Sequence, residues 1–216
     1  MSDTPPARRR YDNAGRAAHA AANRAAVMRA AVEVLADRGY SGATMTAIAA
    51  AAGVSVETVY KGFGTKSELV RQVLGAAVVG DDEPVALLDR PEMRAALSEA
   101  TGAAILAAFA EVSMGILARV GPLLGTVLAS GRAGEPELRA IARHSGLQRL
   151  ADLRRVVERV AATGDLRADL DVDRATDILW TVGSPEVYLQ LTVDRGWTPA
   201  AYHDWLSRAL PALLLT

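Results

Sequence analysis

Two short helical segments that meet at a single glycine constrain this chain more than any other feature. In the stretch TAIAAAAGVSVETVYKGFGTKSEL, an alanine-rich run is followed by Gly53 and then by a polar run. Thr44 can cap a helix over residues 45–52, and Gly53 suits the left-handed turn that ends it. Ser55 can cap a second helix over residues 56–62. Two short helices joined in this way have the proportions of a helix-turn-helix.

The two segments differ in residue composition because they would have different roles in the fold. The first combines small residues (Ala49, Ala50 and Ala52) with the larger Ile48, which allows close packing on neighbouring helices. In the second, Val59 points inward while the outer positions are polar or slender, as a helix in a DNA major groove requires. Its N-terminus presents unpaired N–H groups that suit phosphate. We therefore expect the second segment to be a recognition helix.

Lysine is concentrated at this recognition helix. Lys61 and Lys66 are the only lysines of a chain that has 24 lysines and arginines. Thr65 begins a capping box, so Lys66 would open a further helix that ends near Val79. With Tyr60, these lysines would flank the recognition helix with donors that a phosphate backbone accepts.

The charge distribution also separates the N-terminal third from the rest. Residues 1–75 carry ten Lys or Arg against six Asp or Glu, whereas the remainder carries fourteen against nineteen. The formal net charge of −1 therefore hides a basic third joined to an acidic remainder. The basic part could meet a polyanion.

Helical periodicity runs along the whole chain, and we expect an all-α fold. One face of a first helix that ends at Gly39 is formed by Val27, Ala30, Ala31, Val34 and Leu35. Further helices are expected at residues 91–118, 122–130, 136–162, 172–182, 185–195 and 199–214. The pair Gly121-Pro122 is expected to separate the first two of these.

A polar break at Asp81-Asp82-Glu83-Pro84 is the expected domain boundary. We expect a basic arm and the start of the first helix at residues 1–22, and a helix-turn-helix DNA-binding domain at residues 23–80. Residues 81–216 would form an effector-binding and dimerisation domain.

Composition limits the compartment and the chemistry. The chain has no cysteine, which excludes disulfides and thiolate chemistry. The N-terminus MSDTPPARRR has no apolar segment behind its charges, so no secretory signal is expected. The most apolar region, residues 101–130, is cut by charged residues, whereas a membrane span needs about 20 apolar residues in a row. We expect a cytoplasmic protein with no membrane partner.

At the helix-turn-helix residues the chain resembles the TetR family of bacterial transcriptional regulators. The matching positions are Thr44, Ile48, Ala49, Ala52, Gly53, Val54, Ser55, Thr58, Tyr60, Phe63, Lys66 and Leu69. The resemblance implies a homodimer of all-α subunits. A three-helix head of each subunit would bind a palindromic double-stranded DNA operator, and the larger C-terminal domain would hold a small-molecule effector. No cofactor is expected.

The resemblance also assigns contacts to DNA. Positions that match phosphate contacts are Thr58, Tyr60 and Lys66, and positions that match base-facing residues are Thr46, Val56, Glu57 and Lys61. The helix caps Thr44 and Ser55 are the remaining candidate DNA contacts of the head. Gly62 departs from the family, which often has His or Tyr before the Phe. We expect this departure to lower operator affinity.

Two of the DNA-binding candidates have alternative interpretations. Arg8-Arg9-Arg10 is either an arm that follows phosphate or enters the minor groove, or a solubilising tail. Glu57 either accepts from a cytosine amino group or, as we favour, stabilises the N-terminus of its own helix.

In the C-terminal domain the sequence indicates an effector pocket and a dimer interface. The pocket candidates are the apolar or weakly polar residues Phe109, Ser113, Met114, Leu117, His144 and Trp180, and an alanine-rich core would explain them equally well. The effector would be apolar or aromatic. The interface candidates, from two helices with wide apolar faces, are Val187, Tyr188, Leu191, Tyr202, Trp205, Leu206 and Leu210. An ordinary intramolecular core is the alternative.

No metal or catalytic site is predicted. Asp169 and Asp171 stand in a run that resembles a calcium loop, but Arg174 and Trp180 occupy positions that need Gly and Glu. We therefore expect a TetR-like regulator, a repressor released by its effector, that is not an enzyme. The alternatives are a ligand-sensing or protein-interaction module with weakened DNA specificity and, third, a helical enzyme.

Overall fold

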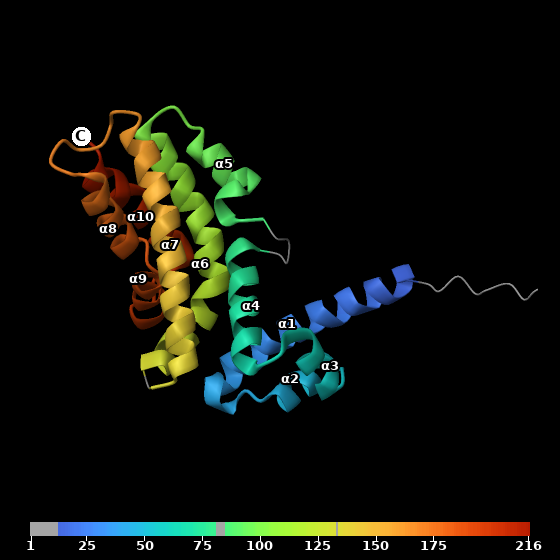
Figure 1. Ribbon diagram of the computed structural model, residues 1–216. Helices are drawn as coiled ribbons and strands as arrows, with labels where there is room; N and C mark the ends of the chain where they lie inside the picture. The colour runs from blue at the N-terminus through green and yellow to red at the C-terminus, as the bar shows by residue number, and fades with distance from the viewer. Residues whose placement is uncertain (1–12, 81–84, 133) are drawn as a thin grey trace, which may run out of the picture.

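The computed structural model describes residues 13–80, 85–132 and 134–216, which form helices arranged as a small head on a longer body (Figure 1). The head contains α1 (Asn13–Gly42), α2 (Met45–Ala52), α3 (Val56–Phe63) and α4 (Lys66–Val79). The body contains η1 (Leu87–Asp89), α5 (Pro91–Leu97), α6 (Gly102–Arg132), α7 (Pro136–Ala161), α8 (Val172–Val182), α9 (Pro185–Leu189), the π-helical turn η2 (Gln190–Asp194) and α10 (Pro199–Leu214). No strand occurs in these ranges, which confirms the all-α prediction.

Local capping signals determine the helices of the head. The hydroxyl of Thr44 accepts from the Ala47 N–H at 3.1 Å and starts α2, which ends at Gly53 with φ 69°. Ser55 and Thr65 cap α3 and α4 in the same way, each at 3.2 Å. The predicted positions of these three helices are therefore confirmed, and α3 extends one residue further, to Phe63.

The first helix is longer than its apolar stripe. It begins at Asn13, and residues 15–22 are exposed on every side, so this part of α1 projects from the head (Figure 1). Gly39, with φ 64° and ψ 178°, interrupts the helix where we predicted its end. Arg8, Arg9 and Arg10 lie outside the described residues.

Two predictions about the body helices are wrong. The segment 91–118 is broken at residues 98–101, between α5 and α6, and α6 continues through Gly121-Pro122. Gly121 has a different function from a helix break. A Cβ there would lie 3.2 Å from the Tyr188 ring, and a Cβ on Gly125 would lie 3.0 Å from Leu189. These glycines let α9 approach α6. The predicted positions of α7, α8 and α10 are confirmed to within one residue.

Helix α6 is central to the body and strongly apolar. By length and composition its part Gly102–Gly121, with a mean hydropathy of 1.7, could cross a membrane. In the structure α6 packs against α1, α4, α5, α7, α9 and α10. Central helices of helical bundles have the same composition, so the length and hydropathy of α6 are explained by its place in the fold.

Two hydrophobic cores fill the molecule, and the first crosses from head to body. Residues of α1 to α4 share it with Val120, Leu123 and Val127 of α6 and with Leu138 and Ile141 of α7. The second core joins α6 to η1, α5, α7, α8, α9 and α10. The head is therefore packed on the body along α6 and α7. The predicted boundary at residues 81–84 lies outside the described residues.

Candidate nucleic-acid interface and ligand site

Helix α3 has one buried face and one exposed face. Val59 and Phe63 are buried in the head core, at 0% and 4% exposure. On the opposite side Glu57 and Lys61 are exposed, and Tyr60 is 54% exposed although its ring is large and apolar. An exposed aromatic phenol beside a lysine and a carboxylate gives the outer face of α3 both donors and acceptors.

The N-terminus of α3 is closed by its own side chains. Ser55 Oγ accepts from the Thr58 N–H, and the two hydroxyl oxygens lie 3.0 Å apart. Hydrogen bonds from the Glu57 N–H and from Ser55 lower the pKa of the Glu57 carboxyl. Glu57 is therefore placed to stabilise the start of its own helix, and a contact of its carboxylate with a base stays a prediction. Val56 is half-buried beside these residues, and Thr44 and Thr46 are exposed at the start of α2.

Lys66 lies differently from Lys61. Its Nζ donates to the Tyr40 carbonyl at 2.8 Å and lies 3.9 Å from the centroid of the Tyr40 ring. We expected the Lys66 ammonium to flank the recognition helix as a donor to phosphate, whereas the structure holds it against the end of α1. A phosphate contact by Lys66 stays a prediction, and the structure adds a role inside the head.

Gly62 is required neither by the backbone nor by packing. It lies within α3 without a positive φ, it is exposed, and a Cβ built there meets nothing within 4 Å. Gly64, which follows α3, has φ 73° and therefore needs glycine. The outer surface at Gly62 therefore has room for a Cβ atom.

An arginine that the sequence analysis did not identify orients α3. The Arg24 guanidinium lies 4.8 Å from the centroid of the Phe63 ring, and its Nη2 donates to Gln72 Oε1 of α4 at 2.9 Å. Gln72 in turn donates to Glu68, which also accepts from Arg71. The pKa of Glu68 is lowered to about 2 by these hydrogen bonds, chiefly by that from Arg71. No sequence spacing relates Arg24 to Phe63, so only the fold identifies this contact.

The predicted effector-pocket residues do not come together around one cavity. Phe109, Ser113 and Leu117 are buried in the body and Met114 is half-buried, as the alternative of an ordinary core describes. His144 and Trp180 are exposed on α7 and α8, away from the buried Phe109 and Leu117. An effector pocket lined by these residues stays a prediction, because sequence periodicity does not give the direction of their side chains.

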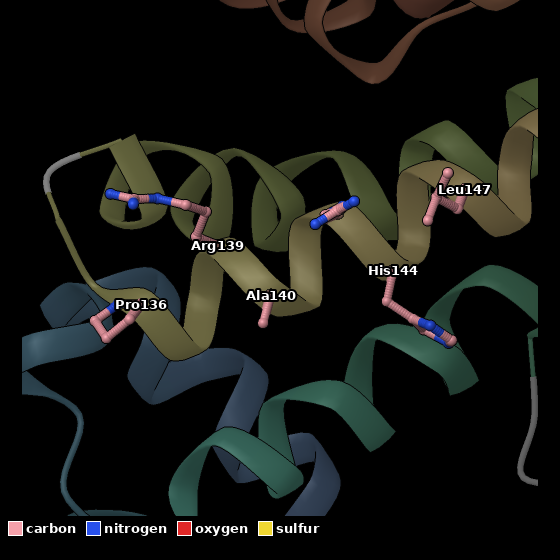
Figure 2. Close-up of a pocket in the computed structure, with 6 residues that line it drawn as sticks. Pro136, Arg139, Ala140, His144 and Leu147 are labelled. Atoms are coloured by element: carbon pink, nitrogen blue, oxygen red, sulfur yellow. The ribbon is translucent and has the colours of Figure 1, made fainter.

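His144 belongs to an open surface groove along α7. Figure 2 shows Pro136, Arg139, Ala140, His144 and Leu147 around this groove, with His144 pointing toward the side on which α4 lies. A second open hollow is lined by residues of the loop before α10 and of α10 itself: Gly196, Trp197, Thr198, Ala201, Asp204, Trp205 and Arg208. Both hollows are shallow and open to solvent.

The predicted dimer interface is corrected in part. Tyr188, Tyr202, Leu206 and Leu210 are buried within the single chain, so they form its core and not an exposed contact surface. Tyr202 packs edge-on against Tyr188, with ring centroids 5.1 Å apart. Val187, Leu191 and Trp205 are half-buried and remain available at the surface.

Further large apolar side chains of the C-terminal elements, which the sequence analysis did not select, are exposed. The C-terminal apolar surface consists of Trp180, Val193, Trp197 and Leu213, which are between 37% and 70% exposed, and the half-buried Trp205. Trp197 and Trp205 pack edge-on at 6.3 Å. Within the described ranges, no group of three or more His, Cys, Asp or Glu residues could hold a metal ion.

Comparison with known proteins identifies the head. Residues 27–73 match the sequence profile of the bacterial regulatory proteins of the tetR family. Among curated proteins, none matches the chain.

Solved structures share the fold of the whole chain. The regulator FadR from Bacillus subtilis, in complex with stearoyl-CoA, is 22% identical with a TM-score of 0.69, and covers 86% of this chain and 96% of its own. NalD of Pseudomonas aeruginosa, the secondary repressor of the MexAB-OprM multidrug efflux pump, is 18% identical with a TM-score of 0.66. The match covers 91% of this chain and 98% of NalD. A protein from Saccharomonospora viridis, described as a transcriptional regulator in complex with choline, is 18% identical with a TM-score of 0.68, covering 89% and 97%. At these identities the likeness establishes the fold.

Proposed function

Residues 27–73 belong to the tetR family of bacterial regulatory proteins, and from that premise we propose that this protein represses transcription by binding a palindromic operator as a homodimer. One observation carries the proposal. Val59 and Phe63 fix α3 in the head core, and the opposite face presents Glu57, Tyr60 and Lys61 to solvent. This is the arrangement in which a helix enters the major groove while its scaffold stays outside.

The side-chain contacts to DNA would be of two kinds, some to backbone phosphates and others to bases. Tyr60, Thr58 and the helix caps would lie where backbone phosphates pass, and Lys61 and Thr46 would face the bases. Arg8, Arg9 and Arg10 would add an arm along the duplex. Two recognition helices of a dimer would occupy successive major grooves, about 34–36 Å apart.

The C-terminal apolar surface would carry the dimer contact. Trp180, Trp197 and Leu213 are exposed although such side chains gain about 1.5–3 kcal/mol or more on burial. Exposed aromatic residues of this size commonly mark interaction sites. A second copy of the chain would cover them and fix the distance between the two heads.

A small apolar or aromatic effector would bind between the body helices. The relatives bound to stearoyl-CoA and to choline support a ligand-binding body. Entry would require the buried side chains around Phe109 and Leu117 to part. The bound ligand would favour a head spacing that no longer fits the operator, so DNA affinity would fall by a population shift. Such a regulator would act in the cytoplasm.

The direct test uses DNA from the intergenic regions beside the gene. Fluorescence anisotropy should detect binding that weakens steeply with salt. Tyr60→Ala and Lys61→Ala should each reduce it, whereas Arg94→Ala, at the far end of the body, should not. Absence of salt-sensitive binding to any of these duplexes would contradict the proposal.

A ligand-sensing module with weakened DNA specificity is the second candidate, and Gly62 is the observation that favours it. The outer surface of α3 lacks a side chain at this position. If this candidate is correct, the affinity ratio between any selected duplex and random-sequence DNA stays near one. Effector binding would then survive Tyr60→Ala unchanged.

A further inference from the structure

Tyr40 joins the head to the body, and each part of the residue contacts a different element. It lies in the last turn of α1, directly after Gly39, and is only 6% exposed. Its Oη donates to Glu137 Oε2 at the start of α7, at 3.3 Å. Its carbonyl accepts from Lys66 Nζ at 2.8 Å, and its ring lies 3.9 Å from the same ammonium.

Lys66 connects Tyr40 to the recognition helix. It is the first residue of α4, and only Gly64 and Thr65 separate it from the end of α3. A continuous series of interactions therefore runs from α7 through Glu137, Tyr40 and Lys66 to the turn that ends α3. Physical coupling between sites is carried by contiguous interactions of this kind.

Much of the remaining packing between head and body is apolar, although Ser41 Oγ also donates to Glu135 Oε1, at 3.5 Å. The head packs on α6 and α7 through aliphatic side chains such as Val120, Leu123 and Ile141. The hydrophobic effect is non-directional, so such a surface tolerates small rotations. Hydrogen bonds depend on angle and distance, so the hydrogen bonds of Tyr40 can select one orientation.

The opposite end of α4 is held independently. Arg119 of α6 donates from Nε to the Ala77 carbonyl at 3.1 Å. Helix α4 is thus tied at its start through Lys66 and Tyr40, and near its end through Arg119. Release of the Tyr40–Glu137 hydrogen bond would leave the Arg119 contact, the long Ser41–Glu135 hydrogen bond and the shared apolar core to hold the head, so the range of head orientations would widen.

We propose that Tyr40 is a positioning residue, which sets the angle at which α3 is presented to DNA by linking Glu137 to Lys66. The proposal rests on the proposed DNA-binding function. Burial, together with the charge and hydrogen bond of Glu137, raises the pKa of Tyr40 to about 12, so its phenol remains a donor at neutral pH. Loss of the hydroxyl would widen the range of head orientations without removing any group that touches DNA.

The chain provides a matched control. Tyr202 is also a buried tyrosine whose Oη donates to a protein acceptor, the Val182 carbonyl at 3.4 Å, but it lies in the body core. Tyr202→Phe therefore makes the same chemical change away from the head. Glu137→Gln keeps an oxygen that accepts from Tyr40, whereas Glu137→Ala removes it.

The orientation can be measured directly because the chain has no cysteine. Cysteines placed at the exposed positions Ala51 in α2 and Ala151 in α7 carry spin labels, and labelled chain is diluted with unlabelled chain. Electron–electron double resonance then gives the head-to-body distance distribution. We expect Tyr40→Phe and Glu137→Ala to widen it, and Glu137→Gln and Tyr202→Phe to leave it unchanged.

DNA binding is measured with two duplexes: the tightest binder selected from a random library and an unselected random-sequence duplex. Tyr40→Phe and Glu137→Ala should weaken binding to the selected duplex roughly three- to tenfold, the equivalent of one hydrogen bond. Binding to the random duplex should not change. The double variant should be no weaker than either single variant, because both remove the same hydrogen bond.

Two results would overturn the proposal: an unchanged distance distribution in Tyr40→Phe, or equal weakening on both duplexes. A wild-type protein that binds neither duplex refutes the proposed function instead, and the distance distribution then decides alone whether Tyr40 sets the head angle.

Discussion

The guanidinium of Arg24 lies over the ring of Phe63, 4.8 Å from its centroid, and so ties α1 to the end of the recognition helix. The same side chain donates to Gln72 of α4 at 2.9 Å. We expect Arg24→Ala to lower the free energy of unfolding by about 1–2 kcal/mol, because it removes both the cation–π interaction and a hydrogen bond. Urea denaturation measures this decrease. Arg24→Lys, which keeps a cation but not the planar fork, should recover part of it.

The two glycines at the end of α3 should respond in opposite ways to alanine. Gly62→Ala should stabilise the protein by about 0.5–1 kcal/mol, because Gly62 is helical and its Cβ would meet open space. Gly64→Ala should destabilise it by about 1–3 kcal/mol, because Gly64 has φ 73° and ψ −111°, a conformation that residues other than glycine rarely adopt. Thermal unfolding of the two variants measures both changes in stability. Destabilisation by Gly62→Ala would show that α3 needs glycine there.

Removal of Lys61 should change the salt dependence of DNA binding. If the Lys61 ammonium neutralises one phosphate per subunit, Lys61→Ala lowers the slope of log K against log salt by about 0.9 for each phosphate that is no longer neutralised. Titrations of one duplex at several salt concentrations give the slope. Arg94→Ala on α5, which lies at the end of the body away from α3 (Figure 1), is the control and should leave it unchanged.

Stability should fall at high pH because of two buried tyrosines. Burial is the chief cause that raises the pKa of Tyr40 and of Tyr202 from 10.0 to about 12. The folded state therefore holds these protons more tightly than the unfolded state. The resulting stabilisation is complete below pH 10 and is lost as the pH rises toward 12. Urea denaturation across this range should show a smaller decline for Tyr40→Phe than for the wild type.

A charge on the C-terminal apolar surface should weaken dimerisation. Trp197→Glu should raise the dimer dissociation constant about tenfold or more, because an unpaired carboxylate would replace an aromatic ring that the second copy would cover. Sedimentation velocity measures the change. Leu147→Glu, at a 58% exposed leucine of α7 outside this surface, is the matched control. An equal change in the dimer dissociation constant for both variants would show that the interface between copies lies elsewhere.

Local signals in the sequence predicted much of the head. Thr44, Ser55 and Thr65 cap their helices through backbone N–H groups three residues ahead, and such hydrogen bonds depend on neighbouring residues alone. The same locality explains why α8 and α10 begin and end where predicted.

Features that depend on distant residues were not predictable in this way. Gly121 suggested a helix break, whereas its small size serves the packing of Tyr188 from α9. The apolar stripe of α10 was correct, but periodicity cannot tell whether Leu206 faces its own chain or a second copy. The inward position of the Lys66 ammonium depends on Tyr40, 26 residues earlier in the chain.

The core shared between the head and α6–α7 has a mechanical consequence. Val120, Leu123 and Leu138 interlock with the head helices, so the head cannot swing freely as if on a flexible tether. Any reorientation must slide one aliphatic layer over another, in the manner of a shear motion, and collective motions of this type take microseconds to milliseconds. A conformational change in the middle of α6 would therefore alter the orientation of the recognition helix in one discrete step.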